Sequence, residues 1–143
     1  MRLVIAGVAL EFLDALTTYI LIMSGLGYEA NPRISFINTM PEWVFPLFLA
    51  QAAFVGGVGY LAYLEMRYGF MRAYYVTAMP LIGYLVHKAI VVANNVAVGL
   101  FGFGGFEYEL SETLKMSMVL GGLAYGVFRI KHFNGQNSIL KDG

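Results

Sequence analysis

The sequence predicts an all-α, polytopic integral membrane protein with four transmembrane helices in one bundle and one domain. Hydrophobic residues make up 59% of the 143 positions and charged residues only 13%, which is about half of the charge that a soluble domain carries. A membrane-spanning helix needs about 20 mainly apolar residues, and four such stretches use up most of the chain. The composition therefore leaves no room for a separate soluble domain.

Composition also excludes several classes of function. The formal net charge is zero, so nothing favours nucleic acid as a partner. The chain has no cysteine, which rules out disulfides, thiolate metal sites and cysteine nucleophiles. Membrane lipid is the expected partner. Arg2 and the apolar residues after it are similar to a signal peptide, but Glu11 and Asp14 follow at once without a clear cleavage site. We interpret this stretch as an uncleaved first span.

The first predicted span, residues 3–26, has one polar face. Glu11, Asp14 and Thr18 are spaced i, i+3 and i+7, and residues with this spacing share one side of a helix. Two acids within an apolar run are costly to bury. This face should therefore point towards other polar groups of the protein.

The exit from the first span is the sequence Tyr28-Glu29-Ala30-Asn31-Pro32. Pro32 disfavours helical geometry at Asn31, so the helix should end before it. Residues 33–41 are too short to cross a membrane and should lie at its surface or partly inserted. This segment leads into the second span.

The second span covers residues 43–67 and the fourth covers residues 109–129. Each carries a pair of small residues four positions apart, and this spacing allows close approach of a neighbouring helix. These pairs are Ala53/Gly57 in the second span and Gly122/Gly126 in the fourth. Packing within the bundle is the favoured role of both pairs, and a homo-oligomer contact through either face is the alternative.

The third span, residues 73–98, also has a polar side. His87, Lys88, Asn94 and Asn95 lie within an arc of about 120° when each residue advances by about 100°. A polar face at this depth has to meet protein or water. Gly99 to Gly105 should form the loop that follows this span.

The distribution of basic residues predicts the orientation in a cell membrane. Four spans place both termini on the same side as the turn after the second span. That side carries six of the nine basic residues, namely Arg2, Arg67, Arg72, Arg129, Lys131 and Lys141. Because positive loops stay in the cytoplasm, both termini should be cytoplasmic.

The polar faces of the first and third spans should meet. At about 1.5 Å per residue, Asp14 and His87 reach similar depths near the middle of the membrane. We expect a cluster of Asp14, His87, Asn94 and Glu29 that leads from the membrane centre to the outer face. The candidate ion-binding or ligand-binding residues are Asp14, Glu29, His87, Asn94, Thr18, Asn31, Lys88, Asn95 and Glu11.

Three functions compete for this cluster. The first is binding or conduction of a small ion, proton or ligand, in which a bound cation is the only cofactor suggested. The second is an intramembrane hydrolase, either acid/base or metal-assisted with His87, Asp14 and Glu29 as ligands. The third is structural: Asp14 or Glu11 pairs with Lys88 or His87 and fixes helix register, as in a membrane subunit of a larger complex.

The string D-x-x-T-T followed by E-A-N-P resembles the signature of a family of small archaeal and bacterial membrane proteins of unknown function, the DUF5658 type. The motif lies in the first quarter of the chain, and the remainder is similar in size and number of spans. The resemblance supports the four-span fold and names no activity. It marks Asp14, Thr17, Glu29, Asn31 and Pro32, together with an asparagine late in the third span at Asn94 or Asn95.

Overall fold

The structure is a computed structural model that describes residues 1–102 and 107–139, with side chains described up to residue 131. The described residues form helices and no strand, which confirms the all-α prediction for this part of the chain. The four long helices are α1 (Arg2–Ser24), α2 (Val44–Arg67), α3 (Met71–Phe101) and α4 (Tyr108–Ile139), and the two short 3₁₀ helices are η1 (Ser35–Asn38) and η2 (Pro41–Trp43).

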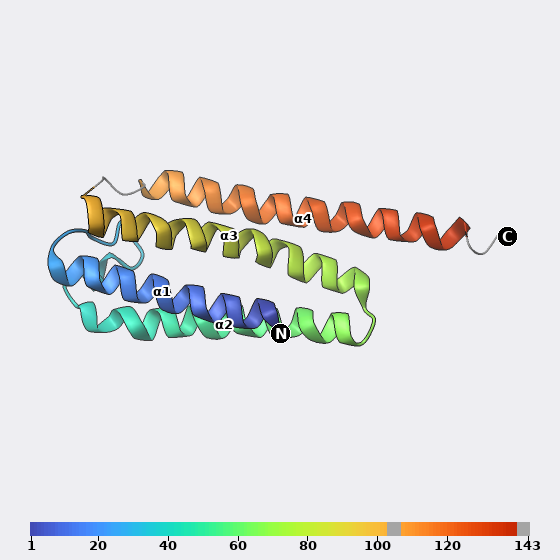
Figure 1. Cartoon of the computed structure of the whole chain (residues 1–143), viewed down its shortest axis with the longest axis horizontal. Coiled ribbons are helices and arrows are strands. Elements are labelled where there is room, and N and C mark those ends of the chain that lie inside the picture. The colour runs from blue at the N-terminus through green and yellow to red at the C-terminus, as the bar shows by residue number, and fades with distance from the viewer. Residues whose placement is uncertain (103–106, 140–143) are drawn as a thin grey trace.

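The long helices lie side by side (Figure 1). Helix α1 packs against α2 and α3, and α4 packs mainly against α3. The N-terminus, the α2–α3 turn and the C-terminal end of α4 point towards one end of the bundle. The opposite end is formed by residues 25–43, the end of α3 and the start of α4. We call this second end the loop end.

Three helices are long and apolar enough to cross a membrane: α1, the continuous stretch from η2 through α2, and α3. Their bounds agree with the first three predicted spans to within a few residues. Helix α4 does not belong to this group of three. Its first turns carry Glu112 and Lys115, which lower its hydropathy. The structure thus supports a membrane protein with three apolar spans, and the fourth span stays a prediction.

The ends of the helices differ in places from the predicted boundaries. Helix α1 ends at a glycine with a left-handed backbone, Gly25 at φ +70°, a conformation that glycine adopts without strain. Helix α3 runs through Phe101 to Gly102 at φ +66°, so the predicted loop 99–105 begins as helix, and residues 103–106 lie outside the described part. Helix α4 continues to Ile139, well beyond the predicted end at residue 129.

The segment predicted to lie at the membrane surface folds back onto the bundle. Helix η1 brings Ile37 into a buried cluster with Ala15 of α1 and with Val44 and Phe48 of α2. Ile37 and Val44 are both 0% exposed, so this apolar contact fixes the segment against α1 and α2. The loop end is therefore a packed cap rather than a free connection.

Glycines set the distance between α3 and α4. A Cβ atom added at Gly122 or Gly126 would collide with a backbone carbonyl oxygen of α3, and one added at Gly83 would collide with a carbonyl oxygen of α4. The Gly122/Gly126 face is thus occupied by α3 of the same chain, as the packing interpretation predicts. The Ala53/Gly57 face is exposed, and a homo-oligomer contact through it stays a prediction.

Candidate functional site

The polar faces of α1 and α3 meet as the sequence predicts, and an ion cluster of three residues lies at their contact. Lys88 Nζ lies 2.6 Å from Asp14 Oδ2 and 3.1 Å from Glu11 Oε2. Glu11 and Asp14 are one helical turn apart, which places both carboxylates on the side of α1 that faces α3. The exposed fractions of Glu11, Asp14 and Lys88 are 0%, 4% and 8%. We call these three residues the buried triad.

Further groups surround the Lys88 ammonium. It lies 5.0 Å from the centre of the Phe48 ring and 5.9 Å from that of Tyr84, within the range of cation–π attraction. Gln51 Oε1 accepts a longer hydrogen bond from Lys88 at 3.4 Å. The Tyr84 hydroxyl donates to Glu11 Oε1 at 2.7 Å. The ammonium is thus held by two carboxylates, one amide oxygen and two aromatic faces.

Asn95 connects α3 to the carboxylate of Asp14 and to the threonines next to it. Its Nδ2 lies 3.2 Å from Asp14 Oδ1, 3.2 Å from Thr17 Oγ1 and 3.4 Å from Thr18 Oγ1. Asp14 therefore receives hydrogen bonds on both of its oxygens. Asn94 lines the same cavity as Asp14, and among the described residues no hydrogen bond joins the two.

His87 contacts α4 instead of Asp14. Its Nε2 lies 3.1 Å from Ser111 Oγ, the side chain is 5% exposed, and Nδ1 has no hydrogen-bond partner within the described part of the chain. The expected line from Asp14 through His87 to Asn94 is therefore not formed as a bonded chain. The described side chains also include no group of three His, Asp or Glu that could hold a metal ion, so the proposed ligand set of His87, Asp14 and Glu29 is not assembled.

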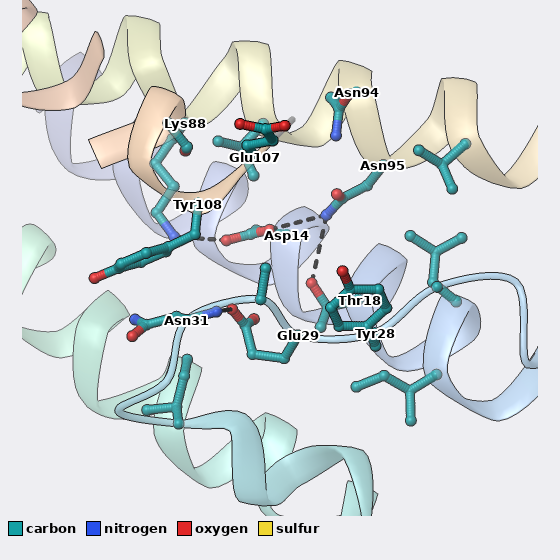
Figure 2. Close-up of a pocket in the computed structure, with 18 of the residues that line it drawn as sticks. Asp14, Thr18, Tyr28, Glu29, Asn31, Lys88, Asn94, Asn95, Glu107 and Tyr108 are labelled. Carbon is teal, nitrogen blue, oxygen red and sulfur yellow. Dashed lines mark hydrogen bonds and ion pairs between the residues drawn. The ribbon is translucent and has the colours of Figure 1, made fainter. Parts of the chain in front are cut away.

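A cavity of about 750 Å³ opens at the loop end and reaches the buried triad. Figure 2 shows Asp14 and Lys88 in its interior, with Glu29 and Asn31 on the loop side and Glu107 and Tyr108 from the start of α4. All nine predicted binding residues except Glu11 line this cavity. Glu11 does not line the cavity, but it forms an ion pair with Lys88, which does.

The loop that carries Glu29 is held in place by side-chain amides. Asn38 accepts a hydrogen bond from the Glu29 backbone N–H at 2.6 Å and donates to the Glu29 carbonyl oxygen at 3.1 Å. Glu29 Oε1 accepts from the backbone N–H of Asn31 at 2.7 Å, and Asn31 Oδ1 accepts from that of Arg33 at 3.0 Å. The E-A-N-P exit is thus a compact turn that holds Glu29 at the cavity.

The surroundings of Glu29 shift the pKa of its carboxyl upward. Burial raises the pKa of the Glu29 carboxyl above its usual value of 4.5, and the negative charge of Asp14 adds to this shift. The hydrogen bond from Asn31 and the positive charge of Lys88 oppose it. The net direction is upward because desolvation disfavours the charged form most strongly.

Sequence reasoning missed several residues of the site. Tyr84 precedes Lys88 by four positions, and this i, i+4 spacing places it on the same polar face, so it could have been found. Ser111 lies in the first turn of α4 and Glu107 directly precedes that helix, a region to which no site residue was assigned by prediction. Asn38 belongs to no helical pattern in the sequence, because its side chain hydrogen-bonds the backbone of Glu29, nine residues earlier.

Comparison with protein-family models, curated proteins and solved structures finds no match for this chain. The resemblance through D-x-x-T-T and E-A-N-P therefore stays a prediction.

Proposed function

We propose that this chain is a four-span cell-membrane protein with cytoplasmic termini that binds a small cation in the cavity at the loop end. The cation is a metal ion, a proton or a cationic organic ligand. The observation that carries the proposal is the connection between an open cavity of about 750 Å³ and a buried triad that contains two carboxylates and one ammonium.

The charge balance of the site supports a cation. When all three groups are ionised, the buried triad has a net charge of −1 in a place with little water. An unpaired charge in a low-dielectric interior is costly. A proton or a cation that enters the cavity would remove this excess. Four acidic side chains and two lysines line the cavity itself, so its lining is negative as well.

The proposed orientation makes the cavity accessible from outside the cell. Arg2, Arg67 and Arg72 stand at or near the ends of α1, α2 and α3 that are opposite to the loop end. Arg129 and Lys131 lie in the C-terminal half of α4, which runs away from the loop end. The positive-inside rule assigns the end opposite to the loop end to the cytoplasm. The loop end, which carries Glu29 and Glu107, would then face the exterior.

Thermal unfolding of the purified protein in detergent tests the proposal. Sodium, potassium, ammonium and tetramethylammonium chlorides are compared at equal ionic strength, and pH is varied separately. We expect at least one cation, or protonation, to raise the melting temperature, because a ligand that binds only the folded state stabilises it. The response should be lost in Asp14→Asn and reduced in Glu29→Gln. If neither salt identity nor pH changes the stability, the proposal is refuted.

The same experiment separates binding from a purely structural role. A structural triad predicts that Asp14→Asn lowers stability while the wild-type protein responds to no cation. A binding role predicts a folded Glu29→Gln variant with a weakened response. Glu29 is useful here because it lies outside the apolar spans.

A hydrolase is the second candidate, and the contact between His87 and Ser111 favours it. A histidine nitrogen 3.1 Å from a serine hydroxyl is the geometry of a general base and a nucleophile. The candidate ranks second because His87 Nδ1 lacks a carboxylate to orient the ring. Labelling by a fluorophosphonate probe in the wild-type protein, lost in Ser111→Ala, would support it.

A further inference from the structure

We infer that the cation bound by this cavity is an organic ammonium group, held at the cavity mouth between two tyrosine–glutamate pairs. One pair is Tyr28 and Glu29 on the loop after α1, and the other is Glu107 and Tyr108 at the start of α4. This inference rests on the proposed cation-binding function and specifies its ligand class.

The two pairs come from distant parts of the chain and line the same cavity. In Figure 2, Asp14 is seen between Glu107 on one side and Glu29 on the other, with Tyr108 and Tyr28 beside them. The hydrogen bonds of Asn38 to the Glu29 backbone hold the first pair in position. The second pair is held by α4, where Ser111 N–H donates to the Glu107 carbonyl oxygen at 3.0 Å.

The carboxylates of Glu29 and Glu107 form no ion pair within the described part of the chain. Of the two lysines that line the cavity, Lys88 is paired with Asp14 and Glu11, and Lys115 is paired with Glu112. The two carboxylates and the two aromatic rings are therefore available to bind a cationic ligand.

Acidic and aromatic groups together are suited to an ammonium group more than to a metal ion. Metal ions such as calcium and magnesium require six or more oxygen ligands at short distance, and the described side chains assemble no metal-binding group of three. Aromatic faces attract an alkylated ammonium through its positive charge and make apolar contact with its methyl groups. The cavity volume of about 750 Å³ also lies in the range of sites for organic ligands.

The interior of the cavity already holds one ammonium group in this manner. The Lys88 ammonium is bound by two carboxylates and lies over the rings of Phe48 and Tyr84. The mouth repeats this combination of carboxylates and aromatic rings, without a lysine. His87 also lines the cavity, is 5% exposed, and has a ring nitrogen, Nδ1, without a hydrogen-bond partner among the described residues.

An ammonium group of this kind has two sources in a membrane. It can belong to a free small amine or to the choline headgroup of a phospholipid, and the chemistry recognised by the mouth is the same for both. Binding is measured by isothermal titration calorimetry on the full chain in a maltoside detergent. The probes are choline, its neutral isostere 3,3-dimethylbutan-1-ol, and potassium ion.

We expect choline to bind, and its neutral isostere to bind at least about tenfold more weakly, since only the charged probe gains cation–π and carboxylate contacts. Glu29→Gln and Glu107→Gln should each weaken choline binding by about fivefold or more. Tyr108→Leu should weaken it, whereas Tyr108→Phe keeps the ring and should not. Glu109→Gln is the matched control, because this residue is exposed and does not line the cavity.

Repeating the choline titration in nanodiscs distinguishes a free amine from a lipid headgroup as the source of the ammonium group. If the natural ligand is a headgroup, choline binds more weakly in phosphatidylcholine than in phosphatidylglycerol discs, because the lipid competes. If it is a free amine, the two affinities agree.

Equal binding of choline and its neutral isostere, or variants at Glu29 and Glu107 that bind like Glu109→Gln, would overturn the inference. Stabilisation by pH or metal ions without any ammonium binding would overturn it and leave the proposed function standing. Absence of binding together with no stabilisation by any cation or by pH would refute both.

Discussion

Removal of the Lys88 ammonium should destabilise the protein strongly, because it leaves two carboxylates buried without a counter-charge. Asp14 and Glu11 lie 2.6 and 3.1 Å from Lys88 Nζ, and both are almost fully inaccessible to solvent. Breaking a buried ion pair from one side costs about 3 to 5 kcal/mol. Methionine is similar in length to lysine and uncharged, so Lys88→Met tests the charge with little change in packing.

A second ion pair of the same chain provides the control. Lys115 pairs with Glu112 one turn earlier on α4, and their side chains are 28% and 36% exposed. A pair of this exposure contributes about 0.2 to 1 kcal/mol. Lys115→Met should therefore cost several times less than Lys88→Met. Unfolding in mixed detergent micelles, followed by circular dichroism, measures the free energy of both variants.

The decisive result is the effect of removing the carboxylates as well. In the Lys88→Met background, adding Glu11→Gln and Asp14→Asn should recover most of the lost stability, because the orphaned charges disappear. In the wild-type background Glu11→Gln alone should change stability by less than about 1.5 kcal/mol, since Lys88 keeps Asp14 and Tyr84 keeps a hydrogen-bond acceptor. If Lys88→Met costs no more than Lys115→Met, the reasoning from burial is wrong.

Three further predictions concern packing, pH and the loop. Gly122→Ala should destabilise the protein by about 1 to 3 kcal/mol, because the added Cβ atom would collide with the backbone of α3. Gly121→Ala should not, because a Cβ atom added there has no neighbouring atom within 4 Å. Thermal unfolding of both variants tests the difference. Burial raises the Glu29 pKa above 4.5, so the folded state binds this proton more tightly than the unfolded state. The resulting stability is full below pH 4.5 and is lost as pH rises through the pKa of the folded state. Glu29→Gln should flatten this pH dependence of the unfolding free energy, measured from pH 4 to 8. Asn38→Ala removes both hydrogen bonds to the Glu29 backbone, and amide hydrogen exchange at residue 29 should accelerate by about tenfold or more.

The polar face of the first span could be predicted from spacing alone. Glu11, Asp14 and Thr18 repeat at i, i+3 and i+7, and all three are buried at the contact with α3. Helical periodicity defines such a face because it depends only on the geometry of one helix. The bounds of the three apolar spans were predictable for a similar reason, since long apolar runs determine them.

The partners across the interface could not be predicted in the same way. His87 and Lys88 are neighbours in sequence, so they point about 100° apart around α3, and only the packing of the other helices decides which of them meets α1. Helix α4 packs on α3 and its Ser111 meets His87, while Lys88 faces Asp14. Asn94 and Asn95 are also neighbours in sequence, and of the two it is Asn95 that donates a hydrogen bond to Asp14, while Asn94 lines the cavity. Helix rotation is a property of the assembled bundle, and one helix alone does not specify it.

The glycine contact between α3 and α4 bears on how this chain enters a bilayer. Helix α4 is the long helix that is not among the three apolar spans. Its close backbone approach to α3 through Gly83, Gly122 and Gly126 supplies van der Waals contact that a lone helix lacks. If α4 is the fourth span that we propose, insertion of α3 and α4 together as one hairpin would let the more apolar α3 assist the insertion of α4. A bulky residue at these glycines would then be expected to change the topology of the C-terminal segment as well as the stability of the folded bundle.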